Sequence, residues 1–258
     1  MDLQQYLRRI GVVGELPATP ATLQALHLAH ATHIPFENID VLLGRGIDLD
    51  PAALERKLVA SERGGYCFEH NLLFATVLED LGFKVTLLSG RVRAGAESIR
   101  PRTHMLLLVT FPGSRWIADV GFGSGGLLFP VPFDPAAESA QFHWTYRVVP
   151  EGAAWVMQSR REGDWADLYV FTLDAHERID YDVLNHYTST YPRSVFRSNL
   201  IAQLPLPERR ITLRNRELTS DAGDSVTTRI LDDAELNAVL NDVFGIVLPA
   251  GTRLPIPD

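Results

Sequence analysis

The sequence is poor in several features that mark whole classes of protein. Its 258 residues include one cysteine, which excludes an internal disulfide and a thiolate-rich zinc site. The 24 lysines and arginines are outnumbered by 32 aspartates and glutamates. The resulting net charge of −8 argues against nucleic acid as the main partner and against a polybasic membrane patch. No apolar run approaches the length of about 18 residues that predicts a membrane span.

The sequence also lacks targeting and repeat signals. The first six residues, MDLQQY, do not follow the basic-then-apolar plan of a signal peptide, and no internal repeat is visible. A hydrophobic content of 46 % and a charged content of 22 % are ordinary for a globular protein. The length suffices for a sizeable core, in one large domain or in two or three small ones that share an interface. We therefore expect a cytoplasmic globular protein.

Hydrophobic periodicity predicts three successive parts. Helical patterns cover residues 3–10, a stretch from Thr19-Pro20 onward, residues 52–59 and a run from Cys67 to Gly82. Strand-like runs follow at 84–93, 103–111, 115–120, 142–149, 154–159 and 165–171, which suggests a small antiparallel barrel or curled sheet. A helix at 175–187, strands at 210–214 and 225–231, and a last helix from 232 to Gly245 complete the pattern. We place the boundaries at 1–83, 84–190 and 191–258.

The only cysteine, Cys67, stands at a Gly-Gly turn that runs directly into an apolar helical pattern. The unpaired N–H groups and the positive dipole end of a helix N-terminus favour a thiolate over a thiol. A buried packing cysteine is the alternative interpretation. A nucleophilic role requires a base within hydrogen-bond reach and a third group that orients the base.

Among eight histidines, His104 is the best candidate for that base. It opens an apolar strand, and Asp119 closes the next one, so a hairpin would make the two side chains cross-strand neighbours. His70 shares a helix face with Cys67, but its ring would lie along the helix rather than above the thiol. We interpret His27, His30 and His33 as packing or surface histidines. The predicted constellation is Cys67, His104 and Asp119.

The motifs around these residues resemble those of a known family. RGGYCFEHN at 63–71, IPFEN at 34–38, TH at 103–104 and DVGFG at 119–123 are similar in order and spacing to the arylamine N-acetyltransferases of the prokaryotic type. The resemblance implies an α+β fold with an N-terminal helical bundle, a central antiparallel β-barrel and a C-terminal α/β lid. It also implies a papain-like Cys-His-Asp triad at the three residues above.

The family resemblance further implies a double-displacement reaction. Acetyl-CoA would be the acyl-donor co-substrate, an aromatic amine or hydrazine the acceptor, and an acyl thioester on Cys67 the intermediate. No permanently bound cofactor and no metal are expected. We assign the acceptor pocket to Phe36, Phe68, Thr103 and Phe122. The glycine-rich residues Gly123, Ser124, Gly125 and Gly126 are a candidate cradle for the CoA pyrophosphate.

Two further expectations concern charge and the chain's end. Arg9, Glu37 and Arg63 are predicted to form a structural ion cluster, because buried charges must be paired. The lid is expected to be shortened, which keeps open an amide synthase that acts on polyketide-type thioesters. A papain- or transglutaminase-like hydrolase uses the same Cys-His-Asp order and is a third possibility. A non-catalytic binding module is disfavoured, because all three triad residues are present.

Overall fold

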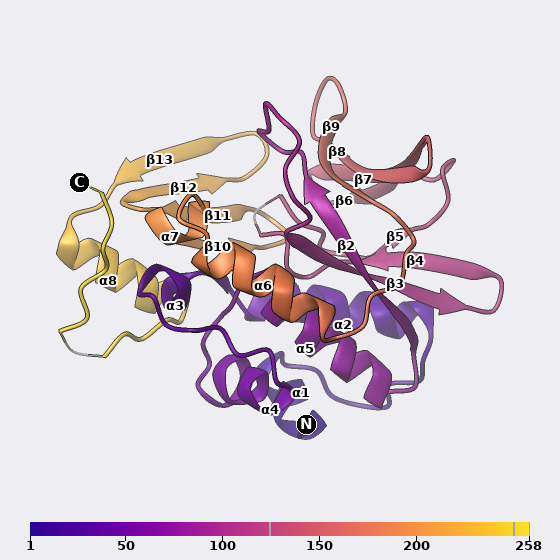
Figure 1. The fold of residues 1–258 in the computed structure, drawn as a ribbon, viewed down its shortest axis with the longest axis horizontal. Helices are drawn as coiled ribbons and strands as arrows, with labels where there is room; N and C mark the ends of the chain where they lie inside the picture. Colours follow the sequence, from indigo (N-terminus) through magenta and orange to yellow (C-terminus); the bar gives the residue numbers. More distant parts are fainter. Residues whose placement is uncertain (124, 250, 258) are drawn as a thin grey trace.

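The computed structural model describes residues 1–123, 125–249 and 251–257. Helices of the N-terminal third gather beneath two antiparallel sheets (Figure 1). These helices are α1 (Leu3–Arg9), α2 (Pro20–His33), α3 (Ile39–Leu42), α4 (Pro51–Leu54), the π-helical segment η1 (Glu55–Ala60) and α5 (Cys67–Asp80). Local signals start two of them: the side chains of Thr19 and Asp50 accept N–H groups of the first turns of α2 and α4, each beside a proline.

The central part is an eight-stranded antiparallel sheet that curls into a nearly closed barrel. Its strands are β2 (Lys84–Val92), β3 (His104–Phe111), β4 (Ser114–Ala118), β5 (Val131–Pro132), β6 (Ser139–Gln141), β7 (Trp144–Glu151), β8 (Ala154–Arg160) and β9 (Ala166–Phe171). They are ordered β5-β4-β3-β2-β9-β8-β7-β6. The edge strand β5 contacts β7 across the opening, so apolar side chains such as Leu106 and Tyr146 fill the interior.

A second sheet combines one strand from the first part of the sequence with four from the last part. It contains β1 (Phe36–Glu37), β10 (Ile201–Pro205), β11 (Arg210–Arg214), β12 (Glu217–Asp221) and β13 (Val226–Ile230), in that order. Helix α6 (Asp180–Thr190) crosses the front of the molecule to α7 (Val195–Ser198), and α8 (Asp233–Asp242) follows β13 (Figure 1). Since β1 pairs with β10, a segment from the first part of the sequence is built into the sheet of the last part.

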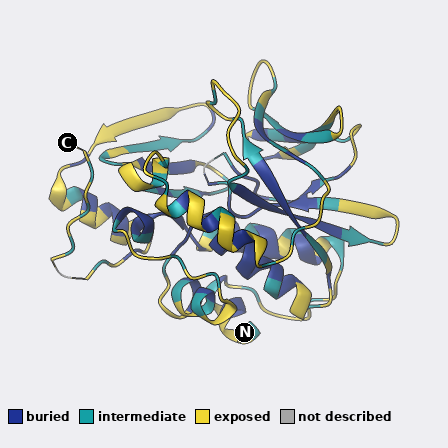
Figure 2. Cartoon of the chain, in the orientation of Figure 1, coloured by how far each residue is buried: buried dark blue, intermediate teal, exposed yellow. Residues whose placement is uncertain are grey.

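Helix α5 and strand β3 form the centre of the fold. Eleven of the helix's fourteen residues are buried, and the helix is mostly dark blue in Figure 2. Successive side chains of β3 point to opposite faces: Met105 and Leu107 pack in the core cluster of α5, whereas Leu106 packs in the barrel interior. Burial on both faces explains why this strand reads as a continuous apolar run.

The structure confirms the predicted α+β fold and differs in several elements. The predicted helix at 175–187 begins instead at Asp180, because His176 pairs with Leu87 and hydrogen-bonds Ser89 of β2. The short strands β1, β5, β6, β10 and β12 were not expected. The domain boundaries at 83/84 and 190/191 stay predictions. In the parts of the chain that the structure describes, no helix is long and apolar enough to cross a membrane.

Candidate active site

Cys67 is the first residue of α5, and close backbone contacts hold the turn before it. A Cβ on Gly64 would lie 2.0 Å from the Pro35 carbonyl oxygen, so only glycine lets this turn pass against the 34–38 segment. The Tyr66 N–H donates to Glu69 Oε2 at 3.0 Å, which satisfies one of the free donors at the start of the helix. The nucleophile candidate therefore sits on a rigid helix start.

His104 and Asp119 are hydrogen-bonded to each other in the interior. The His104 Nε2 to Asp119 Oδ2 distance is 2.7 Å, and both side chains are buried. His104 is the first residue of β3, and Asp119 lies one residue beyond the end of β4. The side chain of His104 packs edge-on against Phe122 and tilted against Tyr169, with ring centroids 5.0 and 4.8 Å away. These aromatic contacts leave the ring little freedom.

The Asp119 carboxylate is held by a network of donors. Its Oδ1 accepts from Asn71 Nδ2 and from the Gly121 N–H, each at 3.0 Å. Burial alone would raise the pKa of Asp119, but the charge and hydrogen bond of His104, together with these other donors, outweigh it and lower the pKa. Asp119 therefore stays ionised and can orient an imidazole N–H.

The Cys67 thiol lies beside the start of β3. Its Sγ donates to the Thr103 carbonyl at 3.6 Å, next to His104. Burial, reinforced by the negative charge of Asp119, raises the pKa of the thiol. This is opposite to the effect expected from the helix N-terminus, because the desolvation of a buried thiolate exceeds what a few N–H dipoles recover. A thiolate here requires a proton acceptor close by.

A cavity of about 830 Å³ opens over these residues. Cys67 and His104 line it, as do three of the four residues assigned to the acceptor pocket, Phe36, Thr103 and Phe122. Phe68, the fourth of these residues, does not line the cavity. Its ring is fully buried against Tyr66 and Tyr181 in the hydrophobic core, because its position on α5 points it away from the cavity.

Part of the glycine-rich run that was assigned to CoA is engaged in hydrogen bonds within the protein. The N–H of Gly126 donates to the Gly123 carbonyl at 2.8 Å, and the Gly126 carbonyl accepts from Tyr146 and Arg210. Gly125 packs against the Phe122 ring. Gly123, Gly125 and Gly126 do not line the 830 Å³ cavity, and Ser124 lies outside the described residues. An N–H that is already bonded cannot cradle a phosphate.

The ion cluster contains two of its three predicted members. Arg63 binds Glu37 with Nε and Nη2 at 2.9 and 2.6 Å. Arg9 does not take part, since its guanidinium donates to the carbonyls of Leu58 and Glu62 instead. The cluster continues through Asp40 and Lys57 to Glu69, the side chain that caps α5. Sequence reasoning missed these three members.

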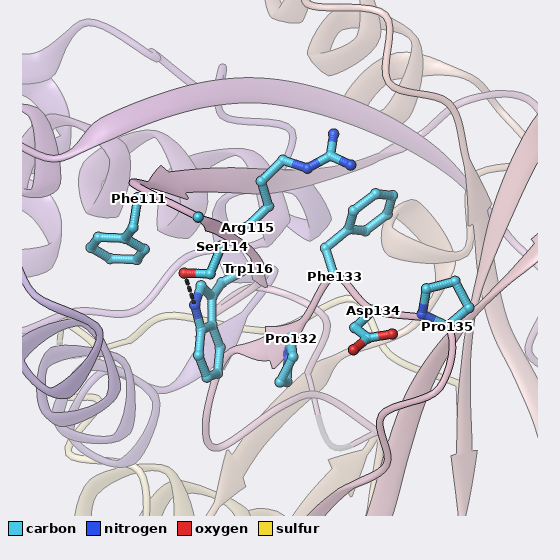
Figure 3. Close-up of a pocket in the computed structure, with 9 residues that line it drawn as sticks. Phe111, Ser114, Arg115, Trp116, Pro132, Phe133, Asp134 and Pro135 are labelled. Atoms are coloured by element: carbon cyan, nitrogen blue, oxygen red, sulfur yellow. Dashed lines mark hydrogen bonds between the residues drawn. The ribbon is translucent and has the colours of Figure 1, made fainter.

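A second hollow of about 580 Å³ lies on the outside of the barrel at the β3–β4 turn (Figure 3). Arg115 lies over the Phe133 ring at 4.6 Å, and the Trp116 indole N–H points to Ser114 Oγ at 3.4 Å. Within the described part of the chain, its lining contains no cysteine or histidine. Cys67 and His104 both line the larger cavity, and the candidate active site is therefore there.

Known proteins are similar to this chain in both sequence and structure. A family model described as N-acetyltransferase matches residues 19–253. An arylamine N-acetyltransferase of Escherichia coli is 42 % identical over 95 % of this chain and 88 % of its own. The structure of the Nocardia farcinica arylamine N-acetyltransferase is 43 % identical and superposes with a TM-score of 0.91, covering 96 % of this chain and 90 % of that one. The chain belongs to the arylamine N-acetyltransferase family.

Membership confirms the resemblance inferred from the motifs, and it makes the chain an acyltransferase. A related structure, the Mycobacterium marinum arylamine N-acetyltransferase in complex with CoA, is 35 % identical with a TM-score of 0.90, covering 95 % of this chain and 93 % of that one. The similarity extends over most of the chain, beyond residues 34–123 that carry the motifs.

Sequence reasoning missed one wall of the 830 Å³ cavity. That wall comes from the end of α6, the segment after it and the second sheet, through Tyr187, Tyr191, Arg193, Phe196, Ile201, Gln203 and Arg214. The run YPRSVFRS at 191–198 carried a signal, because it places aromatic and basic residues in the connection between α6 and β10. Tyr187 and Tyr191 stack at 4.7 Å and present a flat surface.

Proposed function

We propose that the chain transfers an acetyl group from acetyl-CoA to an aromatic amine or hydrazine through an acyl thioester on Cys67. The observation that carries the proposal is the combination in one cavity of Cys67 and His104, with the 2.7 Å bond from His104 to ionised Asp119 behind them. This is the nucleophile, base and orienter arrangement that covalent acyl transfer requires.

The chemistry follows from which atoms are already engaged. His104 Nε2 is bonded to Asp119, which leaves Nδ1 to take the Cys67 proton. The Sγ then bonds to the acetyl carbon, the carbon–sulfur bond of the donor breaks, and the CoA thiol leaves with the proton returned by His104. In the second half, the amine nitrogen attacks the acyl carbon, loses a proton to His104, and Cys67 is the leaving group.

The raised pKa of the thiol fits a coupled transfer. Burial disfavours an isolated thiolate, so the proton moves to His104 as the sulfur attacks. The apolar walls formed by Phe36, Phe122 and Phe196 exclude water from the acyl-enzyme, which would otherwise hydrolyse. They also provide the flat apolar contacts that an aromatic amine would bury.

Three arginines support an anionic donor. Arg100, Arg193 and Arg214 are exposed on the cavity wall, and no carboxylate lines the cavity among the described residues. In a chain of net charge −8, such a surface favours a polyanion such as the phosphates of CoA. We place the donor's phosphates here rather than on the glycine-rich run.

Acylation of the intact protein tests the proposal. Incubation with acetyl-CoA in the absence of amine should add one acetyl group per chain, removable by hydroxylamine. Since Cys67 is the only cysteine, the adduct must map to it, and Cys67→Ala should give none. Addition of an arylamine should discharge the adduct, and steady-state rates should follow double-displacement kinetics.

The same assay separates the other reactions. A hydrolase would be acylated by peptide or amide substrates with no preference for CoA thioesters, and an amide synthase would accept long thioesters far better than acetyl. Absence of any acyl adduct from CoA thioesters, while Cys67 still reacts with iodoacetamide, would overturn the proposed function.

A further inference from the structure

His27, which the sequence suggested was a packing residue, contacts the backbone of Asp119. It lies on α2, 92 residues from Asp119 in the chain, and is fully buried. Its Nε2 accepts the Asp119 N–H at 3.1 Å, and its Nδ1 is 3.1 Å from the Leu128 carbonyl. A carbonyl can only accept, so the ring must carry its proton on Nδ1 and offer a lone pair at Nε2.

The need for this contact follows from where β4 ends. The β3–β4 ladder stops at the pair Leu107 and Ala118, so the N–H of Asp119 has no strand partner. A buried N–H without an acceptor is costly, and a turn without a partner is free to shift. His27 supplies the acceptor at the first residue after the strand.

The next two N–H groups of the turn are also hydrogen-bonded. The Val120 N–H donates to Asn71 Oδ1 at 3.1 Å, and the Gly121 N–H donates to the carboxylate of Asp119 itself. Three successive backbone donors are thus fixed by three different acceptors. Of the three, only His27 comes from α2, and its ring is itself held edge-on by Phe74 at 5.8 Å.

We infer that His27 is a positioning residue of the active site, which sets the direction of the Asp119 carboxylate toward His104 through the Asp119 backbone. Burial lowers the pKa of His27 to about 4, so the ring is neutral and keeps its Nε2 lone pair at ordinary pH. The inference rests on the proposed function, because it concerns how the Cys67–His104–Asp119 unit is aligned.

Substitutions that keep one ring nitrogen at a time test this inference. His27→Gln can place Oε1 near the position of Nε2 and still accept the Asp119 N–H. His27→Asn can place Nδ2 near Nδ1 and keeps only the Leu128 contact, while His27→Leu keeps neither and fills the same apolar space. His33→Asn, on the exposed end of the same helix, is the matched control.

The measurements are the rate of Cys67 alkylation as a function of pH, kcat, the KM for acetyl-CoA and the melting temperature. His27→Asn and His27→Leu should alkylate about tenfold or more slowly and lose kcat by a similar factor, with an unchanged KM. Their alkylation pH profiles should also shift. His27→Gln should stay within about threefold of the wild type, even if it melts as early as His27→Asn.

Alkylation and kcat that track melting temperature in all three variants, with no advantage for glutamine, would overturn the positioning role. So would a wild-type pH profile in His27→Leu, which remains informative if His27→Asn does not fold. Failure of the proposed function has a different signature, because the wild-type chain would then form no acyl adduct at all.

Discussion

At the scale of single residues, the site depends on which hydrogen-bonding atoms are already engaged. Asp119 has both carboxylate oxygens occupied, one by His104 and the other by Asn71 and Gly121. Its charge is stabilised by these bonds in spite of complete burial. An ionised acceptor of this kind fixes the tautomer of His104, which leaves the other ring nitrogen free for the thiol.

Asp119→Asn therefore tests the orienting charge. The amide preserves the shape but removes the charge that holds the His104 N–H, so Cys67 alkylation should slow by roughly a hundredfold or more. The measurement is the iodoacetamide rate at several pH values, with circular dichroism to show that the variant is folded. Asp134→Asn, on the outer barrel hollow of Figure 3, is the matched control. If Cys67 of a folded Asp119→Asn variant were alkylated at the wild-type rate, Asp119 would not be part of the proposed triad.

At the scale of elements, the cavity is made by segments that meet only in the folded chain. The start of α5 and the ends of β3 and β4 supply the reactive groups, and the α6–α7 segment with β10 and β11 supplies the opposite wall. The Asn38 side chain joins these halves, since it donates to the carbonyls of Phe196 and Asn199 and accepts the Ile201 N–H. The IPFEN motif thus holds the cavity together.

Removing a positive charge from the cavity wall should weaken binding of the acyl donor more than it slows the chemical step. Arg193→Gln and Arg214→Gln should each raise the KM for acetyl-CoA by about three- to tenfold with little change in kcat, because a charge-assisted contact to phosphate is lost. The effect should shrink at high salt. Arg8→Gln, an equal charge change at an exposed position of α1, should leave the KM unaltered.

A short donor sharpens this test. An acetyl thioester of N-acetylcysteamine carries no phosphates, so its KM should not respond to either arginine variant. Equal increases for the short donor and for acetyl-CoA would mean that the arginines act on the shape of the cavity and not on the phosphates.

At the scale of the whole molecule, buried neutral histidines connect the helical part to the cavity wall. Tyr6 Oη is 2.8 Å from His30 Nδ1, His30 Nε2 is 3.0 Å from His70 Nδ1, and His70 Nε2 is 3.1 Å from the Pro35 carbonyl. The carbonyl accepts, so each donor in the chain points the same way. This row of hydrogen bonds connects α1, α2 and α5 to Pro35, the residue before Phe36 in the cavity wall.

These histidines should make the protein sensitive to acid. Burial lowers the pKa of His27 and of His70 to about 4, from an ordinary value near 6.5. Between those values the unfolded chain binds more protons than the folded one, so stability is full above about pH 6.5 and falls as the pH drops toward 4. The loss amounts to roughly 3 kcal/mol for each histidine.

Urea unfolding from pH 7 to pH 4.5 measures this loss. The slope of the unfolding free energy against pH gives the number of protons taken up on unfolding, and carboxylates contribute to it. Comparison with His70→Gln isolates the contribution of one histidine, because this variant should take up nearly one proton fewer. His186→Gln, on the exposed face of α6, is the control. An unchanged slope in His70→Gln would show that the buried ring does not titrate on unfolding.

The sequence by itself determined the family, the three-part α+β fold and the candidate triad, because each depends on local signals. Each signal lies within a short run of neighbouring residues. These signals are the Gly-Gly turn before an apolar helix, the polar residue that opens an apolar strand, and each of the family motifs. The predictions that depended on one stretch alone were less secure. The glycine-rich run suggested a phosphate cradle, although its N–H at Gly126 is spent on an internal bond.

Only the tertiary structure decided which groups meet across the chain. Phe68 faces the core because helix geometry turns it from the cavity, and Arg9 finds carbonyls where Glu37 was expected. His27 contacts Asp119, and Arg193 and Arg214 line the same cavity as Cys67, although many tens of residues separate them in the sequence. Pairing over such distances is set by how sheets and helices pack around shared cores, and no local pattern in the sequence encodes it.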